Sequence, residues 1–433
     1  MRKKSNKKMM IGIALLLMIA MLFVSACSPT EETEEVEVPE EPAEMPEEAE
    51  EEVEEIAFAS EPPVSGFNNG TYRGTYGDRG DQQVSVQFTL TDGVISNLGY
   101  RHLYYGEADY RQMDEEHPMY PVKLQHEQIA SYLEGKTLED LEDLYEPENF
   151  VEDVDTFSGA TIRANKVYSA IQDGLNRGVY SPSEPVYKVL EGPYDDGTYR
   201  GLFEDGGFQQ LGVQFDLKDG MIHDVRFRQL YYGETDHTRI EEGDPMYPVK
   251  VQHEQMAAYL EGKPVDAIFD LFNPKDFVED VDTFSGATIR GNKMFSAMKD
   301  ALNRGVYSPA NSVTKDIGPY PDGRYRGVFS DGGTQQVGIQ FYLEEGMFTD
   351  LSFRRLNYAG IDFMDIDEEE EMYPVLIQHE QVLEYLEGKS LETVFDLYEP
   401  GDFVEDIDTY TGATLRGNKV LSAIRDGLNR GIY

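Results

Sequence analysis

Apolar and polar residues alternate over a short segment that occurs once in each third of the chain. In residues 84–90 the alternation predicts a strand with one buried face. Asp92-Gly93 then favours a tight turn into a second strand over residues 94–103. The same turn recurs at Asp219-Gly220 and at Glu345-Gly346.

Apolar residues at helical spacing follow these strands in two places. Residues 120–133 are predicted to form a helix, with Pro121 in its first turn and Gly135 just beyond its end. A second stripe stops before Gly178 and consists of Ile162, Val167, Ala170, Ile171 and Leu175. Strands followed by amphipathic helices predict an α+β fold, with helices packed on one face of an antiparallel sheet.

Short signatures show that this pattern is present three times. Gly70-Thr71-Tyr72-Arg73-Gly74 recurs at 197–201 and, with one change, at 323–327. The segment 175–180 likewise recurs at 302–307 and 428–433. Units of this size can hold their own cores. We therefore expect three tandem copies of a small domain, at residues 66–180, 195–307 and 320–433, with linkers at 181–194 and 308–319 that contain Pro and Ser.

The amino-terminal segment has the order of regions found in an export signal. Residues 1–26 begin with basic side chains, continue through an apolar run and end in small residues, which indicates a signal peptide. A plain anchor helix is the alternative, but it leaves Cys27 unexplained. Val24-Ser25-Ala26-Cys27 resembles the lipobox of bacterial lipoproteins, which implies cleavage before Cys27 and lipidation of its thiol. That lipid would anchor the protein to a bilayer on the extracytoplasmic face.

Residues 27–65 are predicted to form a disordered acidic linker. Fifteen glutamates and no basic residue lie between Glu31 and Glu55, and three prolines interrupt the run. We interpret this stretch as a spacer between the lipid and the folded part; a solubilising tail is the alternative. The whole chain carries a net charge of −46, which argues against nucleic acid as a partner.

The cysteine count limits which cofactors the chain can hold. Cys27 is the only cysteine, so lipidation would leave no thiol for a disulfide, a cysteine zinc site or a thiolate-bound iron–sulfur cluster. A redox cofactor would therefore have to be held in another way.

One motif occurs in each unit just before the last predicted helix, and it is a candidate binding site. Its copies are Asp155-Thr156-Phe157-Ser158-Gly159-Ala160-Thr161, Asp282-Thr283-Phe284-Ser285-Gly286-Ala287-Thr288 and Asp408-Thr409-Tyr410-Thr411-Gly412-Ala413-Thr414. A capping hydroxyl, a glycine and an alanine place the last threonine at a helix amino terminus, where phosphate binds well. Basic residues follow at Arg163, Arg290 and Arg416 and at Lys166, Lys293 and Lys419. The alternative is a capped helix start with surface basic residues.

The motif resembles the flavinylation motif of the FMN-binding domain family. That family includes the FMN-carrying subunits of the Rnf complex and of sodium-pumping NADH:quinone oxidoreductase, and multi-flavin lipoproteins of extracellular electron transfer. The resemblance implies that a flavin transferase esterifies FMN phosphate to Thr161, Thr288 and Thr414, with Asp155, Asp282 and Asp408 serving recognition. Family members often have Thr or Ser where this chain has Arg163, Arg290 and Arg416.

Other repeated residues have two interpretations each. Aromatic residues at Tyr104-Tyr105, Tyr231-Tyr232, Tyr358, Phe157, Phe284 and Tyr410 either stack on a flavin or belong to the core. His126, His253 and His379 lack a second ligand at metal spacing and are interpreted as structural, so no metal site is expected. The acidic pairs Glu152/Asp153, Glu279/Asp280 and Glu405/Asp406 are interpreted as solvated, with divalent-ion binding as the alternative.

Together these features predict an extracytoplasmic electron carrier with three covalent FMN groups. Electrons would come from a membrane quinone or dehydrogenase complex and leave to external acceptors. No general base, nucleophile pair or substrate pocket can be identified in the sequence, which favours a carrier over a stand-alone catalyst. The alternatives are a cell-surface binding lipoprotein without flavin and the flavin subunit of an extracellular reductase.

Overall fold

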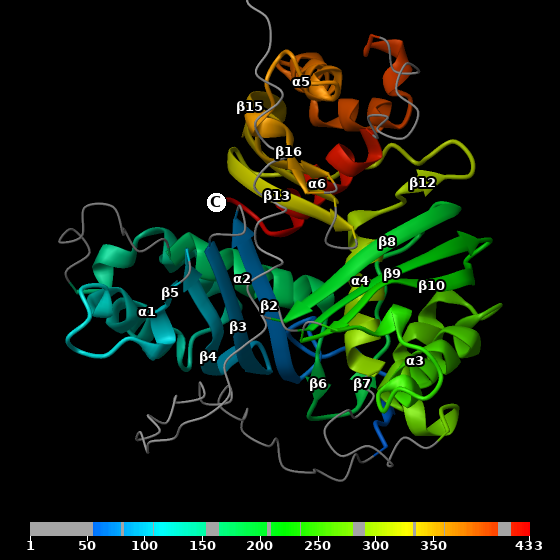
Figure 1. Ribbon diagram of the computed structural model, residues 1–433. Helices are drawn as coiled ribbons and strands as arrows, with labels where there is room; N and C mark the ends of the chain where they lie inside the picture. Colours follow the sequence, from blue (N-terminus) through cyan, green and yellow to red (C-terminus); the bar gives the residue numbers. More distant parts are fainter. Residues whose placement is uncertain are drawn as a thin grey trace, which may run out of the picture. The chain divides into compact units, whose positions relative to one another are not determined.

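Three antiparallel sheets, one after another along the chain, carry the three sequence repeats (Figure 1). The computed structural model describes residues 55–78, 82–106, 108–152, 164–205, 209–233, 235–279, 291–331, 335–358, 360–405 and 417–433. Helices and sheets together make the protein a mixed α+β fold, as the periodicity predicts.

Four strands have the same spatial order in the three sheets, and the first two sheets have a fifth strand at one edge. The first sheet consists of β5 (Ala108–Asp109), β4 (Val94–Tyr105), β3 (Gln82–Thr91), β2 (Gly70–Asp78) and β6 (Ser181–Pro182). The second consists of β11 (Thr235–Asp236), β10 (Met221–Tyr232), β9 (Gln209–Lys218), β8 (Gly197–Asp205) and β12 (Ser308–Pro309). The third, read from its other edge, consists of β13 (Gly323–Asp331), β14 (Gln335–Glu344), β15 (Met347–Tyr358) and β16 (Ile361–Asp362). A short parallel pair joins β1 (Phe58–Ala59) to β7 (Val186–Tyr187).

In each repeat, two α-helices with 3-10 helices around them follow the strand β5, β11 or β16. The first of the two is α1 (Tyr120–Leu133), α3 (Tyr247–Leu260) or α5 (Tyr373–Leu386), and the second is α2 (Ala164–Arg177), α4 (Gly291–Arg304) or α6 (Gly417–Asn429). The 3-10 helices are η1 (Tyr110–Gln112), η2 (Leu138–Tyr145), η3 (Pro147–Asn149), η5 (His237–Arg239), η6 (Val265–Phe272), η7 (Pro274–Asp276), η9 (Phe363–Asp365), η10 (Leu391–Tyr398) and η11 (Pro400–Asp402). Within the described parts of the chain, no helix combines the length and apolarity needed to cross a bilayer.

The strands and helices expected from periodicity are confirmed. The alternating segment lies in β3, where Val86, Phe88 and Leu90 are fully buried. Asp92 and Gly93 both have positive φ, as the tight turn requires. The predicted helix 120–133 is α1, and the second stripe lies in α2, which packs against β2 and β3. Ile162, which we placed in that stripe, lies outside the described residues.

The glycine that ends the opening signature lets this helix lie close to the first strand. A Cβ at Gly74 would be 2.0 Å from Ala170 O, and a Cβ at Gly201 would be 2.0 Å from Ala297 O. Any side chain there would push the helix off the sheet. The tyrosine of the same signature fills the core; Tyr72 stacks on Phe88 at 5.4 Å between ring centroids. The signature therefore encodes a helix–strand contact.

The segments expected as linkers take part in the sheets. Ser181 and Pro182 of the first linker form β6 beside β2, and residues 186–187 form β7 beside β1. Ser308 and Pro309 of the second form β12 beside β8. The start of each linker is therefore held by backbone pairing, which a composition rich in Pro and Ser does not predict.

The closing signature joins the three repeats into a ring. All described residues belong to one compact unit. Asn303 Nδ2 donates to Asn176 O, Asn429 Nδ2 to Asn303 O at 3.0 Å, and Asn176 Nδ2 to Asn429 O. The final tyrosines stack on the first strand of the next repeat, in the pairs Tyr180–Phe203, Tyr307–Phe329 and Tyr433–Tyr76. The third repeat thus contacts the first in the same way as the first contacts the second and the second contacts the third.

Six charged side chains lie at the centre of this arrangement, and we refer to them as the axial ring: Asp173, Arg177, Asp300, Arg304, Asp426 and Arg430. Arg304 binds Asp300 at 2.8 Å within its helix and Asp426 at 2.7 Å in the next repeat. Arg430 binds Asp426 at 2.8 Å and Asp173 at 3.3 Å in the same way. Arg177 binds Asp173 at 3.0 Å. All six residues are less than a tenth exposed, so each charge depends on its partners.

Backbone groups complete the ring. The carboxylates of Asp173, Asp300 and Asp426 accept the N–H groups of Thr75, Leu202 and Val328 at 2.7–2.8 Å. Burial alone would raise the pKa of Asp426, but Arg304, Arg430 and the Val328 N–H together hold it below its usual value. At Asp300, burial outweighs the attraction of Arg304 and Arg177, so the pKa of its carboxyl group is raised above the usual value.

Removing one arginine from the axial ring is expected to destabilise the whole folded unit. Arg304→Met leaves Asp300 and Asp426 without the cation that bridges them, so the free energy of unfolding should fall by about 3–5 kcal/mol. Urea denaturation followed by circular dichroism measures this. Arg239→Met is the matched control, because its side chain is 85% exposed and its pair with Asp236 should contribute less than about 1 kcal/mol. Equal stability of the two variants would contradict a structural role for the ring.

Candidate functional site

The repeated motif lies in the part of each unit that the structure does not describe. The described chain stops at 152, 279 and 405 and resumes at 164, 291 and 417. The residues outside it are Asp155, Phe157, Ser158, Gly159, Ala160, Thr161 and Arg163; Asp282, Phe284, Ser285, Gly286, Ala287, Thr288 and Arg290; and Asp408, Tyr410, Thr411, Gly412, Ala413, Thr414 and Arg416. Cys27, Asp153, Asp280 and Asp406 also lie outside the described residues. The candidate site is therefore built from the residues that flank the motif.

Two glutamines of α1 form hydrogen bonds with the backbone just before the motif. Gln125 Nε2 donates to Glu152 O at 3.3 Å, and Glu152 N donates to Gln128 Oε1 at 3.0 Å. In the second repeat Gln252 and Gln255 make the same contacts with Glu279. These glutamines flank the histidine in the recurring Gln-His-Glu-Gln segment, and that recurrence is a signal from which their role could have been suspected. Glu152, Glu279 and Glu405 themselves are exposed, in keeping with the solvated interpretation.

The helix that leaves the motif carries a lysine in its first turn. Lys166 Nζ lies 6.0 Å from the ring centroid of Tyr76, and Lys419 Nζ lies 5.7 Å from that of Tyr358. Tyr358 was a candidate for flavin stacking, so the third repeat brings this aromatic residue and the lysine together. Tyr105 and Tyr232, at the equivalent position, are 49% and 42% exposed and are therefore not core residues.

Each repeated histidine is buried beside this helix start. His126 Nδ1 is 2.8 Å from Val122 O in the preceding turn, and the rings of Tyr100 and His126 meet edge to face at 5.5 Å. Burial and the positive charge of Lys166 together lower the pKa of His126 to about 4, although the hydrogen bond with Val122 O acts in the opposite direction. His253 and His379 make the equivalent contact with a backbone oxygen at 2.7 Å, have a phenylalanine as ring partner, and also have a pKa lowered to about 4. The imidazoles are therefore neutral at pH 7, and the structural interpretation fits this geometry.

An unsatisfied acceptor occurs at the start of the second helix in every repeat. The side-chain oxygens of Asn165, Asn292 and Asn418 are buried and have no hydrogen-bond partner among the described residues. Asn292 Nδ2 donates to Tyr180 O at 2.8 Å, which fixes the orientation of its amide. Buried carbonyl oxygens normally have a donor, so three equivalent exceptions beside the motif favour a group that supplies one there. The sequence marked these asparagines only as a repeat signature.

Comparisons with protein-family models, with curated proteins and with solved structures found no match to this chain.

The three buried histidines are expected to make the protein less stable in acid. Their folded pKa of about 4 lies below the ordinary value of 6.5, so the neutral form stabilises the fold fully above pH 6.5. This contribution is lost as the pH falls to about 4, on the order of 3 kcal/mol for each histidine.

Urea denaturation of the wild type and of His253→Gln between pH 7 and pH 4 tests this expectation. The variant should lose less stability than the wild type over that range. His117→Gln is the control, because it removes an exposed imidazole and leaves the three buried ones in place. A wild-type protein and a His253→Gln variant with the same pH dependence would show that the imidazole is not held neutral.

Proposed function

We propose that the protein is an extracytoplasmic, lipid-anchored carrier of three covalent FMN groups, which relays electrons from a membrane quinone or dehydrogenase complex to external acceptors. The proposal depends above all on one observation: the sequence Asp-x-x-[Ser/Thr]-Gly-Ala-Thr occurs three times, each time just before α2, α4 or α6. Its finer organisation would be three tandem FMN-binding domains after a signal peptide and an acidic spacer.

The described residues around each motif suit a phosphate-linked group. The helix that follows has 14 residues in the first two repeats and 13 in the third, long enough to present a positive amino-terminal end. Lys166, Lys293 and Lys419 add a cation in the first turn. The unsatisfied oxygens of Asn165, Asn292 and Asn418 would accept a hydrogen bond from the bound group. These features support attachment at Thr161, Thr288 and Thr414.

Bound FMN would supply the redox chemistry, since it can take up and release one or two electrons. The residues of this chain would position it and set its electrostatic surroundings. The lysines would balance the phosphate charge. The histidines near the lysines are neutral and would add no further positive charge. A flavin transferase would be the partner that attaches the group.

The axial ring supports a relay rather than three separate carriers. Arg304 and Arg430 each bind an aspartate of a neighbouring repeat. The helices that follow the three motifs are thereby held in one ring, which suits electron exchange between carriers at fixed separations.

Flavin attachment is tested by intact-mass spectrometry after expression with a flavin transferase. The wild type should carry three FMN adducts, and Thr161→Val, Thr288→Val and Thr414→Val should each lose one. Thr156→Val, Thr283→Val and Thr409→Val are matched controls within the same motif and should keep all three. A wild-type protein without any adduct, despite an active transferase, would refute the proposal and favour a binding lipoprotein.

Anchoring is tested independently by cell fractionation. Cys27→Ser removes the thiol that would take the lipid, so the protein should move from the membrane fraction to a soluble one. Ser28→Ala, one residue further along, should remain in the membrane fraction. Membrane association of Cys27→Ser equal to that of the wild type would exclude the lipid anchor and leave flavin attachment unaffected.

A further inference from the structure

The third repeat exposes apolar side chains on a segment where the other two repeats are more polar. Ile361 of β16 is 40% exposed and Met364 of η9 is 45% exposed, whereas Phe363 and Ile366 of the same segment are buried. The buried pair fixes the segment to the core, so the exposed pair is held at the surface in a defined conformation. The equivalent residues are Ala108 and Arg111 in the first repeat and Thr235 and Thr238 in the second.

The same segment carries negative charge only. Residues 361–376 contain seven acidic residues and no Lys or Arg, whereas residues 108–123 and 235–250 each contain four acidic residues and two basic ones. All seven acidic residues are exposed: Asp362, Asp365, Asp367, Glu368, Glu369, Glu370 and Glu371. The exposed apolar pair therefore lies next to a strongly negative surface that the other repeats do not have.

The basic residues that the third repeat lacks are bound to neighbouring groups in the first. Arg111 forms an ion pair with Asp109 at 2.7 Å, and Lys123 Nζ donates to a backbone oxygen at 3.2 Å. Met364 and Leu376 stand at these positions in the third repeat. Within the part of the chain that the structure describes, none of the seven carboxylates forms an ion pair. Their charge is therefore available to a partner.

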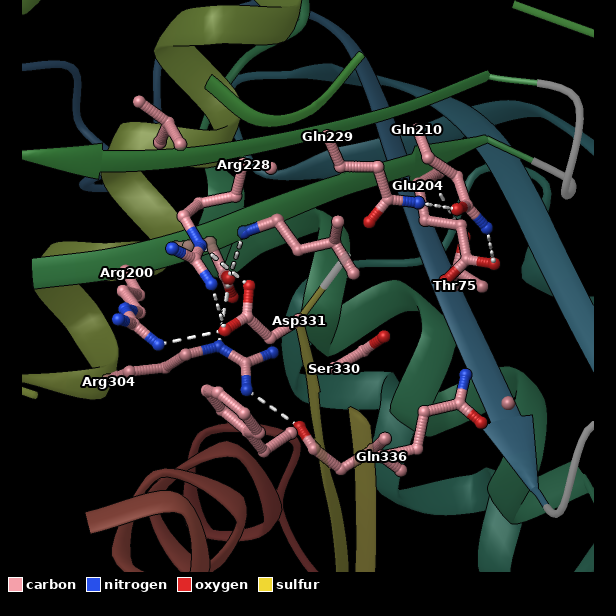
Figure 2. Close-up of a pocket in the computed structure, with 18 of the residues that line it drawn as sticks. Thr75, Arg200, Glu204, Gln210, Arg228, Gln229, Arg304, Ser330, Asp331 and Gln336 are labelled. Carbon is pink, nitrogen blue, oxygen red and sulfur yellow. Dashed lines mark hydrogen bonds and ion pairs between the residues drawn. The ribbon is translucent and has the colours of Figure 1, made fainter. Parts of the chain in front are cut away.

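Charged side chains near the axis are paired within the protein, in contrast to these carboxylates. Asp331 accepts Arg228 Nε, Arg228 Nη2 and Arg200 Nη1 at 2.8 Å each, as Figure 2 shows. Its side chain is only 4% exposed, and it lines a polar pocket of about 120 Å³. The pairing in this pocket joins the second repeat to the third, so it has a structural role.

The exposed apolar pair lies close to the helix that follows the third motif. Tyr358 and Ile361 are directly opposite each other in the β15–β16 pair, so their side chains lie on the same side of the sheet. Lys419 Nζ is 5.7 Å from the ring centroid of Tyr358, and Lys419 belongs to the first turn of α6. A cofactor attached at Thr414 would therefore be near this surface.

Charge determines which kind of molecule suits this surface. The same surface of a second copy would bring seven further carboxylates, and the spacer between Glu31 and Glu55 has fifteen glutamates and no basic residue. Nucleic acid and anionic lipid headgroups are negative as well, so all four are repelled. A protein with Lys and Arg on its surface is attracted, and an apolar centre on that surface would cover Ile361 and Met364.

We propose that this surface, which we refer to as the docking patch, binds a soluble electron-transfer protein whose cofactor edge is apolar and surrounded by Lys or Arg. The docking patch consists of Ile361 and Met364 with the seven adjacent carboxylates. The proposal rests on the proposed function, since the third flavin would be the group that exchanges electrons with the partner. In each encounter one electron would pass from that flavin to the oxidised cofactor of the partner. A small apolar centre with a charged rim suits such brief contacts.

Surface plasmon resonance with a basic c-type cytochrome as the probe tests the docking patch. The full chain is made without flavin transferase and measured at pH 7 and low ionic strength. Glu368→Gln/Glu369→Gln should weaken binding about fivefold, mainly through slower association, and the loss should shrink as salt is added. Glu115→Gln/Glu116→Gln is the matched control, because it removes the same charge at the equivalent positions of the first repeat. It should change the Kd by less than about twofold.

A second variant tests the apolar centre of the docking patch. Ile361→Thr/Met364→Thr has the residues that the second repeat carries at these positions, so it is compatible with the fold. It should raise the dissociation rate about fivefold, because less apolar surface is buried in the complex. Met347→Thr is the control and should bind as the wild type does. Met347 is 37% exposed and begins β15, about 35 Å along the strand from Tyr358.

The docking patch would be refuted by a wild type that does not bind the basic cytochrome, or that binds an acidic c-type cytochrome equally well. An equal loss of affinity in the two glutamine variants would overturn it too, because the probe would then respond only to the net charge of the chain. Unchanged dissociation of the threonine variant would exclude the apolar contact and with it the assignment. Since the protein carries no flavin in these measurements, every outcome is independent of FMN attachment at the motif threonines.

Discussion

Buried charge at the axis is the constraint from which the arrangement of the three repeats follows. Arginine and aspartate are costly to remove from water unless both are paired and hydrogen-bonded. In this protein the pairing is completed across repeat boundaries, as when Arg304 reaches Asp426 and Arg430 reaches Asp173. Asn176, Asn303 and Asn429 close a second ring of hydrogen bonds beside it. A chain with one repeat fewer would leave buried charges without partners, so the repeats act as one unit.

The same helices connect this centre to the proposed cofactor sites. Helix α2 begins directly after the first motif and ends at Arg177 of the axial ring, and α4 has the corresponding bounds. One end of each helix takes part in charge pairing at the axis, and in the proposed function the other end would receive a phosphate. A single helix could then serve both stability and cofactor attachment, since the two demands would fall on residues several turns apart.

Local structure was predictable from the sequence, and contacts between repeats were not. Strand alternation in residues 84–90 and the turn at Asp92-Gly93 depend on near neighbours, so periodicity suffices to find them. The closing signature was visible only as a repeat marker. Arg304 and Asp426 are 122 residues apart in sequence, and no local pattern indicates which partner a polar residue in a helix will meet. The motif was recognised by resemblance, whereas Gln125 and Asn165 became candidates only through their contacts.

Differences among the repeats bear on the proposed relay. Where the second repeat has Gly291, whose Cβ would lie 1.9 Å from Leu271 O, the first has Ala164. Asn357 replaces the tyrosine found at 104 and 231. These changes lie near the proposed sites, while the residues of the axial ring are the same in all three repeats. Because nearby polar and charged groups tune a bound flavin, three carriers with unequal surroundings would differ in potential. In the proposed relay, such differences near the motifs would give the three flavins unequal potentials, while the common axial ring would hold their helices in the same way.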